Sequence, residues 1–177
     1  MPPFARILIL SPMLVLAACK SGKRPSVDPE SLQTPAGESA LRYIIEKCPK
    51  RAEAKLAVIM IGDSPPGPPM PAFVERFRDV PGLTFVDHNR IVAAVVNGTS
   101  RRFDSQTQEP VLELQISALS EPKDGVQEAV AAWAFKDDAE RKRLELKHKP
   151  EGGYDVRELE TIPVPHRNDD TRRASGK

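Results

Sequence analysis

The stretch that decides the fold is Val111–Leu119, VLELQISAL, in which apolar and polar side chains alternate. A period of two places the apolar side chains on one face of a β-strand and the polar ones on the other. We therefore predict a strand with one face in the core and one face toward solvent. The alternating positions are Leu112, Leu114 and Ile116 against Glu113, Gln115 and Ser117.

The three segments after this strand, residues 127–135, 140–148 and 154–162, also alternate, although the alanines of the first leave a helix as its alternative. The last two are joined through Pro150-Glu151-Gly152-Gly153, a sequence typical of a turn. Short connections favour antiparallel neighbours, so we predict that the last four strands form an antiparallel meander. The core-facing positions are Ala129, Ala131, Trp133, Phe135, Leu144, Leu146 and Val156.

An amphipathic helix is predicted for residues 38–48, before Pro49. Its apolar residues have the spacing i, i+3, i+4 and i+7, which places them on one helical face. We interpret Cys48, the last of them, as a small buried hydrophobe, and a reactive or intermolecular thiol is the alternative. The four residues are Leu41, Ile44, Ile45 and Cys48.

Between this helix and the meander, residues 55–61 (KLAVIMI) are apolar at both parities, which indicates a strand covered on both faces. Five prolines at positions 65 to 71 predict a stiff loop, and a short helix is expected at residues 71–79, with Phe73 and Phe77 as an i, i+4 pair. Two more strands, residues 83–86 and 91–96, are followed by a turn at Asn97-Gly98.

These elements predict one α+β domain over residues 38–162, with one or two N-terminal helices packed on a curved antiparallel sheet. The order of elements resembles that of cystatin-like and nuclear-transport-factor-like cones, and this resemblance implies a shape without a function. Residues 163–177 lack apolar periodicity, so we expect a disordered polar tail.

The amino terminus has the layout of an export signal: Arg6, then an apolar run, then Leu16-Ala17-Ala18-Cys19. The last four residues resemble the lipobox of bacterial lipoproteins. This resemblance implies that residues 1–18 are a signal peptide and that Cys19 receives a diacylglyceryl group and palmitate. A plain secretory signal and a cytoplasmic protein with an apolar start are the alternatives.

A lipid on Cys19 implies that the membrane is a partner and that the protein lies in the bacterial cell envelope. Residues 19–37 are polar and contain proline, which predicts a lipidated cysteine and a flexible tether. In two-membrane bacteria an Asp after the Cys holds lipoproteins at the inner membrane. Here that residue is Lys20, which favours the outer membrane, facing the periplasm.

The charges exclude one class of partner. The chain has 26 Lys and Arg against 25 Asp and Glu, so no basic excess is available to bind nucleic acid. The short Arg141-Lys142-Arg143 run is interpreted as a solvated face, since Asp137, Asp138 and Glu140 are neighbours.

Ile61-Gly62-Asp63-Ser64 resembles the nucleophile block of GDSL esterases, which implies Ser64 as a nucleophile. Those enzymes also present a late Asp-x-x-His base, and here Pro163 stands in place of that Asp before His166. His88, His148 and His166 are far apart and lack cysteine pairs, which excludes a recognisable metal site. We therefore predict no catalytic set, no metal and no cofactor, and interpret Asp87-His88 as a polar turn.

The sequence leads to three hypotheses. The first is a non-enzymatic envelope lipoprotein whose domain binds an envelope protein or a small ligand, or supports an assembly. The second is a hydrolase that uses Ser64 with an unrecognised base. The third is a small-molecule carrier with a pocket inside the sheet; the only tryptophan, Trp133, is interpreted as core and not as pocket lining.

Overall fold

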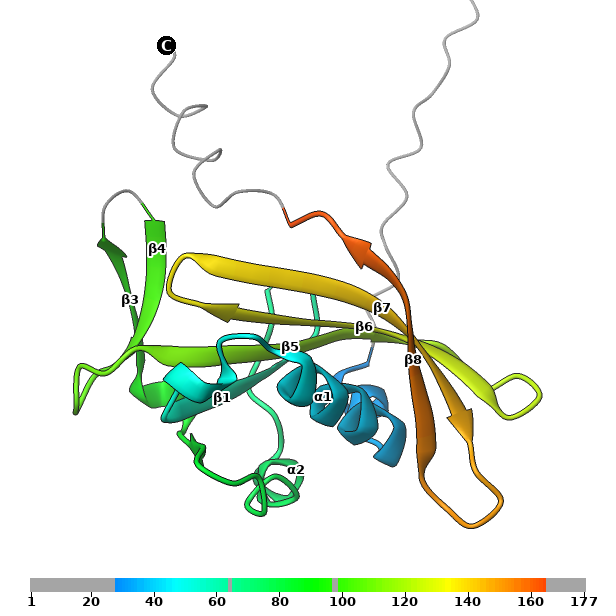
Figure 1. Ribbon diagram of the computed structural model, residues 1–177. Coiled ribbons are helices and arrows are strands. Elements are labelled where there is room, and N and C mark those ends of the chain that lie inside the picture. Colours follow the sequence, from blue (N-terminus) through cyan, green and yellow to red (C-terminus); the bar gives the residue numbers. More distant parts are fainter. Residues whose placement is uncertain (1–27, 64, 97–98, 165–177) are drawn as a thin grey trace, which may run out of the picture.

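The computed structural model describes residues 28–63, 65–96 and 99–164 (Figure 1). The proposed signal peptide, Cys19, Ser64, the Asn97-Gly98 turn and His166 lie outside the described residues. Within the described ranges the chain forms helices and strands in this order: η1 (Pro29–Leu32), α1 (Pro35–Lys47), η2 (Arg51–Glu53), β1 (Leu56–Ile61), α2 (Pro71–Glu75), β2 (Thr84–Phe85), η3 (His88–Arg90), β3 (Ile91–Val96), β4 (Thr99–Asp104), β5 (Val111–Leu119), β6 (Val126–Phe135), β7 (Asp138–His148) and β8 (Tyr154–Ile162). The elements labelled η are short 3-10 helices.

The main sheet has six strands in the order β2-β1-β5-β6-β7-β8. The predicted meander is confirmed, because β5, β6, β7 and β8 pair antiparallel with their neighbours. The prediction of a wholly antiparallel sheet is wrong, since β1 runs parallel to both β2 and β5. A long connection that contains α2 and the β3–β4 hairpin returns the chain to the same end of the sheet, as a parallel pair requires.

One face of this sheet forms the core together with α1. Residues of α1 contact β5, β6, β7 and β8, and Leu41 and Ile44 belong to the same buried cluster as Leu114, Ile116 and Leu144. Phe73 and Phe77 are buried in this cluster as well, although α2 ends before Phe77. The fold class is thus α+β in the coarse sense, with a mixed sheet.

The folded part begins earlier than predicted. Residues 29–37 were expected to belong to the tether, yet Leu32 in η1 is fully buried. Thr34 caps α1 by accepting a hydrogen bond from the Gly37 amide at 3.3 Å, and Pro35 fills the first turn. A Cβ at Gly37 would lie 1.9 Å from the Leu32 carbonyl oxygen, so α1 and η1 approach closely only because this residue is glycine.

β3 and β4 form a separate two-stranded sheet, which stands beside the start of β5, at the left of Figure 1. β4 was not predicted as a strand. Ser117, predicted to face solvent, is only 5% exposed. It lies at the register shift of β5 between Ile116 and Ala118, and Arg141 Nη2 covers its hydroxyl group at 2.9 Å.

Candidate functional site

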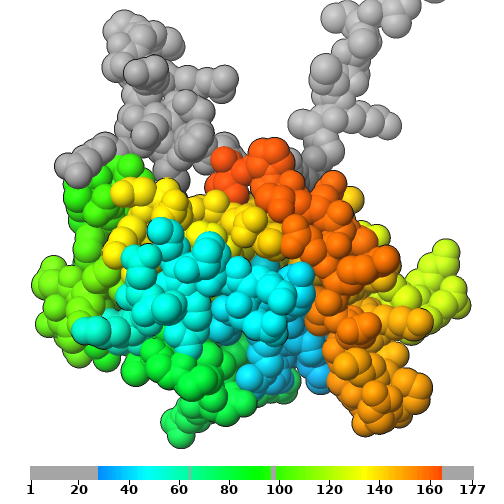
Figure 2. Space-filling view, in the orientation of Figure 1, coloured from blue at the N-terminus to red at the C-terminus, as the bar shows by residue number. Residues whose placement is uncertain are grey.

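A hollow of about 250 Å³ lies on the sheet face opposite α1. Its walls come from β4 and from the segment after β8, and its floor comes from β5, β6 and β7. In Figure 2 the β3–β4 hairpin (green) stands at one end of β7 (yellow) and the end of β8 (orange) lies at the other. The hollow is therefore built by elements that are far apart in the sequence.

Small side chains explain why the floor is hollow. Alternation along β6 directs Ala131, Trp133 and Phe135 into the core, where all three are buried. The residues between them on the open face are Ala132 and Ala134, and Ala139 of β7 pairs with Ala134. Three neighbouring methyl groups leave space above the strands that larger side chains would fill.

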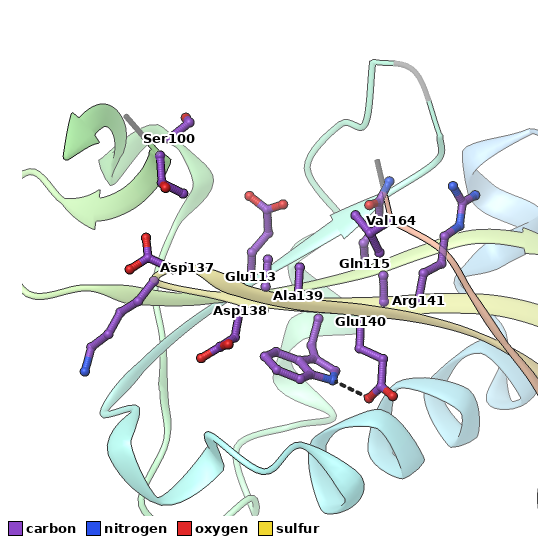
Figure 3. Close-up of a pocket in the computed structure, with 14 residues that line it drawn as sticks. Ser100, Glu113, Gln115, Asp137, Asp138, Ala139, Glu140, Arg141 and Val164 are labelled. Carbon is purple, nitrogen blue, oxygen red and sulfur yellow. Dashed lines mark hydrogen bonds between the residues drawn. The ribbon is translucent and has the colours of Figure 1, made fainter. Parts of the chain in front are cut away.

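Polar side chains of fixed orientation stand around this floor. Figure 3 shows Glu113, Gln115 and Arg141 on the open side of the sheet, whereas Asp138 and Glu140 point to the other side. Gln115 Nε2 donates to the Gly62 carbonyl oxygen at 2.7 Å. The side chain is thus held by the loop after β1.

Arg141 forms one end of the hollow and is held by two contacts. Its Nη2 donates to Ser117 Oγ at 2.9 Å and to Asp63 Oδ1 at 3.2 Å. Ser117 lies at the bulge of β5, so the bulge places its hydroxyl group where this group orients the Arg141 guanidinium. One third of the Arg141 side chain remains exposed, which leaves it accessible to a bound molecule.

Two ion pairs hold the hairpin against the sheet. Arg102 Nε lies 3.1 Å from Glu113 Oε2, and Arg101 Nε lies 2.9 Å from Asp137 Oδ1. Each arginine comes from β4 and each carboxylate from the main sheet or its β6–β7 turn. The wall of the hollow is thus fixed by charge and not by an apolar core alone.

The base of the hairpin is fixed by Asp104, which is fully buried. Arg90 donates to both of its carboxylate oxygens at 2.8 Å, and the amide and hydroxyl groups of Thr107 donate to Oδ2 at 2.9 and 2.8 Å. The hydrogen bonds from Arg90, followed by those from Thr107, hold the pKa of Asp104 well below its ordinary value, although burial opposes them. This group was not predicted from the sequence.

The residues considered for catalysis are not brought together in the described part of the chain. Asp63, next to Ser64, pairs with Arg141. His148 lies on the same strand as Arg141 but seven positions away, which is roughly 23 Å at 3.3 Å per residue, and it packs against Tyr154 at 5.4 Å between ring centroids. His88 lies beside Met60 and Ile91 at a second, smaller hollow.

Asp87-His88 has the structure predicted for a polar turn, since Asp87 caps η3 by accepting from the Asn89 amide at 2.8 Å. Within the described ranges no group of three or more His, Cys, Asp or Glu side chains is placed to hold a metal ion. The same ranges contain no helix that is both long and apolar enough to cross a membrane.

The predictions for two core residues are confirmed. Cys48 is 4% exposed, and burial raises the pKa of its thiol. Trp133 is 5% exposed, and its indole Nε1 donates to Glu140 Oε2 at 3.1 Å. Glu140 points away from the open face (Figure 3). Trp133 is also among the residues that line the hollow, so the prediction is confirmed for its burial and not for the absence of a pocket contact.

The Arg141-Lys142-Arg143 run is not a solvated face throughout, which corrects the sequence interpretation. Lys142 is 8% exposed, and its Nζ lies 2.6 Å from Glu158 Oε2 and 3.5 Å from Glu140 Oε1. Burial lowers the pKa of Lys142, but the two carboxylates outweigh this effect and raise it above the ordinary value. Strand alternation sends this one lysine to the α1 side, while its two neighbours face outward.

Comparisons of the chain with protein-family models, with curated proteins and with solved structures find no match.

Proposed function

We propose that this protein is a lipid-anchored protein of the bacterial envelope, and that its domain is a non-enzymatic module that binds a small polar ligand in the hollow on the open face of the sheet. The observation that carries the proposal is the hollow itself. Its floor is made of alanines, its wall is fixed by ion pairs, and Arg141 and Gln115 are oriented by the protein before a ligand arrives. Such preorganisation lowers the cost of binding.

The size and lining of the hollow favour a small ligand with both donors and acceptors. Its volume of about 250 Å³ is just below the roughly 300–1,000 Å³ of pockets for drug-sized molecules. A guanidinium stands at one end, and carboxamide and hydroxyl groups stand along the sides. A free amino acid, a dipeptide or a monosaccharide has matching size and chemistry.

Two observations favour binding over the alternative hypotheses. A carrier with a pocket inside the cone needs space between α1 and the sheet, yet that face is filled by buried side chains such as Leu41, Leu114 and Ile116. A hydrolase that uses Ser64 needs a base close to it. The neighbouring Asp63 is engaged by Arg141, and His148 lies far from Arg141 on the same strand, β7.

The anchor is inferred from the lipobox resemblance at Cys19. The early start of the domain limits how far from the membrane the domain can lie. Eight residues, 20–27, separate Cys19 from Asp28, so the reach of this segment is at most about 30 Å. Two acyl chains anchor a protein stably, since burial contributes about 0.8 kcal/mol per CH2 group. The domain would thus stay within a short distance of the membrane, at the outer membrane facing the periplasm if Lys20 sorts it there.

Metabolic labelling with palmitate tests the anchor. We expect the wild type to incorporate the label and the Cys19→Ala variant to lose it. Cys48→Ala is the matched control, because this buried thiol is the other cysteine of the chain, and the variant should retain the label. Equal labelling of wild type and Cys19→Ala would contradict lipidation at this position.

Thermal denaturation in the presence of amino acids, dipeptides and monosaccharides tests the hollow. A ligand of the folded state raises the melting temperature. We expect this rise for the wild type and for Ala72→Leu, an exposed alanine of α2 that serves as the control, and its loss in Ala132→Leu, which fills the floor. A compound that stabilises Ala132→Leu as well as the wild type binds elsewhere, and the proposed site would then be wrong.

A further inference from the structure

β3 presents an apolar surface that the described part of the chain does not cover. Its sequence, IVAAVV, is apolar at both parities, a pattern typical of strands that are buried on both faces. Yet Val95 is 75% exposed, Val92 is 41% exposed, and the two alanines between them are exposed as well. Because side chains alternate along a strand, Val92 and Val95 lie on opposite faces of β3, so apolar side chains are exposed on both faces. Such exposure marks an interaction surface.

The backbone of β3 is also open along one edge. Within the described residues β3 pairs with β4 alone. Hydrogen-bonded and non-bonded residues alternate in an antiparallel ladder. The Ser105 amide donates to the Arg90 carbonyl oxygen at 2.7 Å, which identifies Arg90 as one of the residues bonded to the β4 side. Every second residue from Arg90 therefore bonds to β4, and Ile91, Ala93 and Val95 direct their N–H and C=O groups outward.

The other edges of the protein carry the features that prevent pairing between chains. β2, at one edge of the main sheet, has only two residues. β8, at the other edge, has acidic and basic side chains along its length and a register shift against β7. Natural sheets protect their edges with short strands, charges, prolines and bulges. β3 has none of these, which indicates that its edge pairs with a partner.

We propose that β3 pairs antiparallel with β3 of a second copy of this chain, around a two-fold axis through Ala94. This register places Ala94 opposite its own equivalent and Val92 opposite Val96 of the partner subunit. A symmetric antiparallel pair must keep each residue on the same face in both copies, so its axis has to pass through a residue position. Valine–alanine–valine on that face is then complementary to itself.

The charges near β3 are compatible with a second copy. The strand itself has no ionisable side chain. The next strand, β4, contains Arg101 and Arg102, but each pairs with a carboxylate of its own chain, Asp137 and Glu113 respectively. Two hairpins can therefore meet without bringing unbalanced arginines together, whereas a charged peptide partner would find no complementary charge on β3.

The contact is small, because each copy contributes one strand of six residues. Interfaces below roughly 1,000 Å² of buried surface are usually weak or transient, so we expect a weak dimer in dilute solution. The proposed anchor on Cys19 would strengthen it by concentrating copies on one membrane, and this part of the inference rests on the proposed function.

Disulfide crosslinking of the full-length Ala94→Cys variant tests the pairing. Ala94 would face its equivalent as a non-hydrogen-bonded pair, with Cα atoms about 4.5 Å apart, within the range that a disulfide spans. Under mild oxidation we expect a covalent dimer. The matched control is Leu159→Cys on the charged edge strand β8, at a side chain that is 40% exposed, and it should form at least ten-fold less dimer.

A second substitution distinguishes strand pairing from chance collision. Val95→Lys in the Ala94→Cys background adds a charge at a mostly exposed position, so the fold should persist, as circular dichroism can verify, while the dimer yield should fall about ten-fold. Both measurements are repeated with Cys19→Ala at high protein concentration. A dimer there supports strand pairing even if lipidation fails. A yield no higher than that of Leu159→Cys, or one that Val95→Lys leaves unchanged, overturns the proposal.

Discussion

The two faces of the six-stranded sheet are built from the same strands and yet differ in what covers them. On one face α1 packs against Leu114, Ile116 and Leu144, and the space is filled. On the other face Ala132 and Ala134 leave a hollow, and the β3–β4 hairpin above it is held by ion pairs. The comparison teaches that side-chain volume at alternate positions decides which face is core and which face can receive a ligand.

The largest effect is expected when the same substitution, Ala to Leu, is made on each face of the sheet and the two losses of stability are compared. Ala131 and Ala132 are neighbours in β6, but Ala131 is fully buried beneath α1. Ala131→Leu adds three carbons to a filled core, and we expect the free energy of unfolding to fall by about 3 kcal/mol. Ala132→Leu should change it by less than about 0.5 kcal/mol. Urea denaturation measures both, and equal losses would show that the open face is not hollow.

A smaller effect is expected at Gly37, where the covered face begins. Gly→Ala inside a helix normally stabilises by about 1 kcal/mol. Here the added Cβ would meet the Leu32 carbonyl oxygen at 1.9 Å and Ile116 Cδ1 at 3.3 Å. We therefore expect Gly37→Ala to lower the free energy of unfolding by about 2 kcal/mol, in urea denaturation. A stabilised variant would mean that η1 does not pack on α1 as described.

The smallest expected effect is a pH dependence of stability that comes from Asp104, at the base of the β3–β4 hairpin. Because the folded protein lowers the pKa of Asp104, this carboxylate contributes stability that is present above about pH 4 and is lost as the pH falls toward the folded-state pKa. The difference in unfolding free energy between wild type and Asp104→Asn should therefore shrink from pH 6 to pH 2. A constant difference for Asp104→Asn would contradict its role.

Much of the fold could be predicted because alternation is a local property. The bounds of β5 and β8 agree with the predicted strands, and the buried faces of β5 and β6 follow the predicted alternation except at Ser117. The start of α1 was missed by three residues, although the Thr34-Pro35 pair is a recognisable helix start. β4 was missed since its TSRRFD sequence has charges where a strand pattern expects apolar residues.

The candidate site could not be predicted from the sequence, because no local pattern brings its parts together. Arg141 and Ser117 are far apart along the chain, and their contact depends on a bulge. Similarly, β1 and β3 are both six-residue apolar strands, yet β1 is buried on both faces and β3 is mostly exposed. Composition alone does not distinguish them.

The sequence by itself determined which residues form the strands of the meander and which of their side chains face the core, since both depend on the period of two along each strand. Only the tertiary structure decided that β1 joins the sheet in parallel, that alanines of β6 and β7 lie under the hairpin, and that Arg141 is held beside them. The physical reason is that these contacts join distant parts of the chain, and they form only when the whole sheet is assembled.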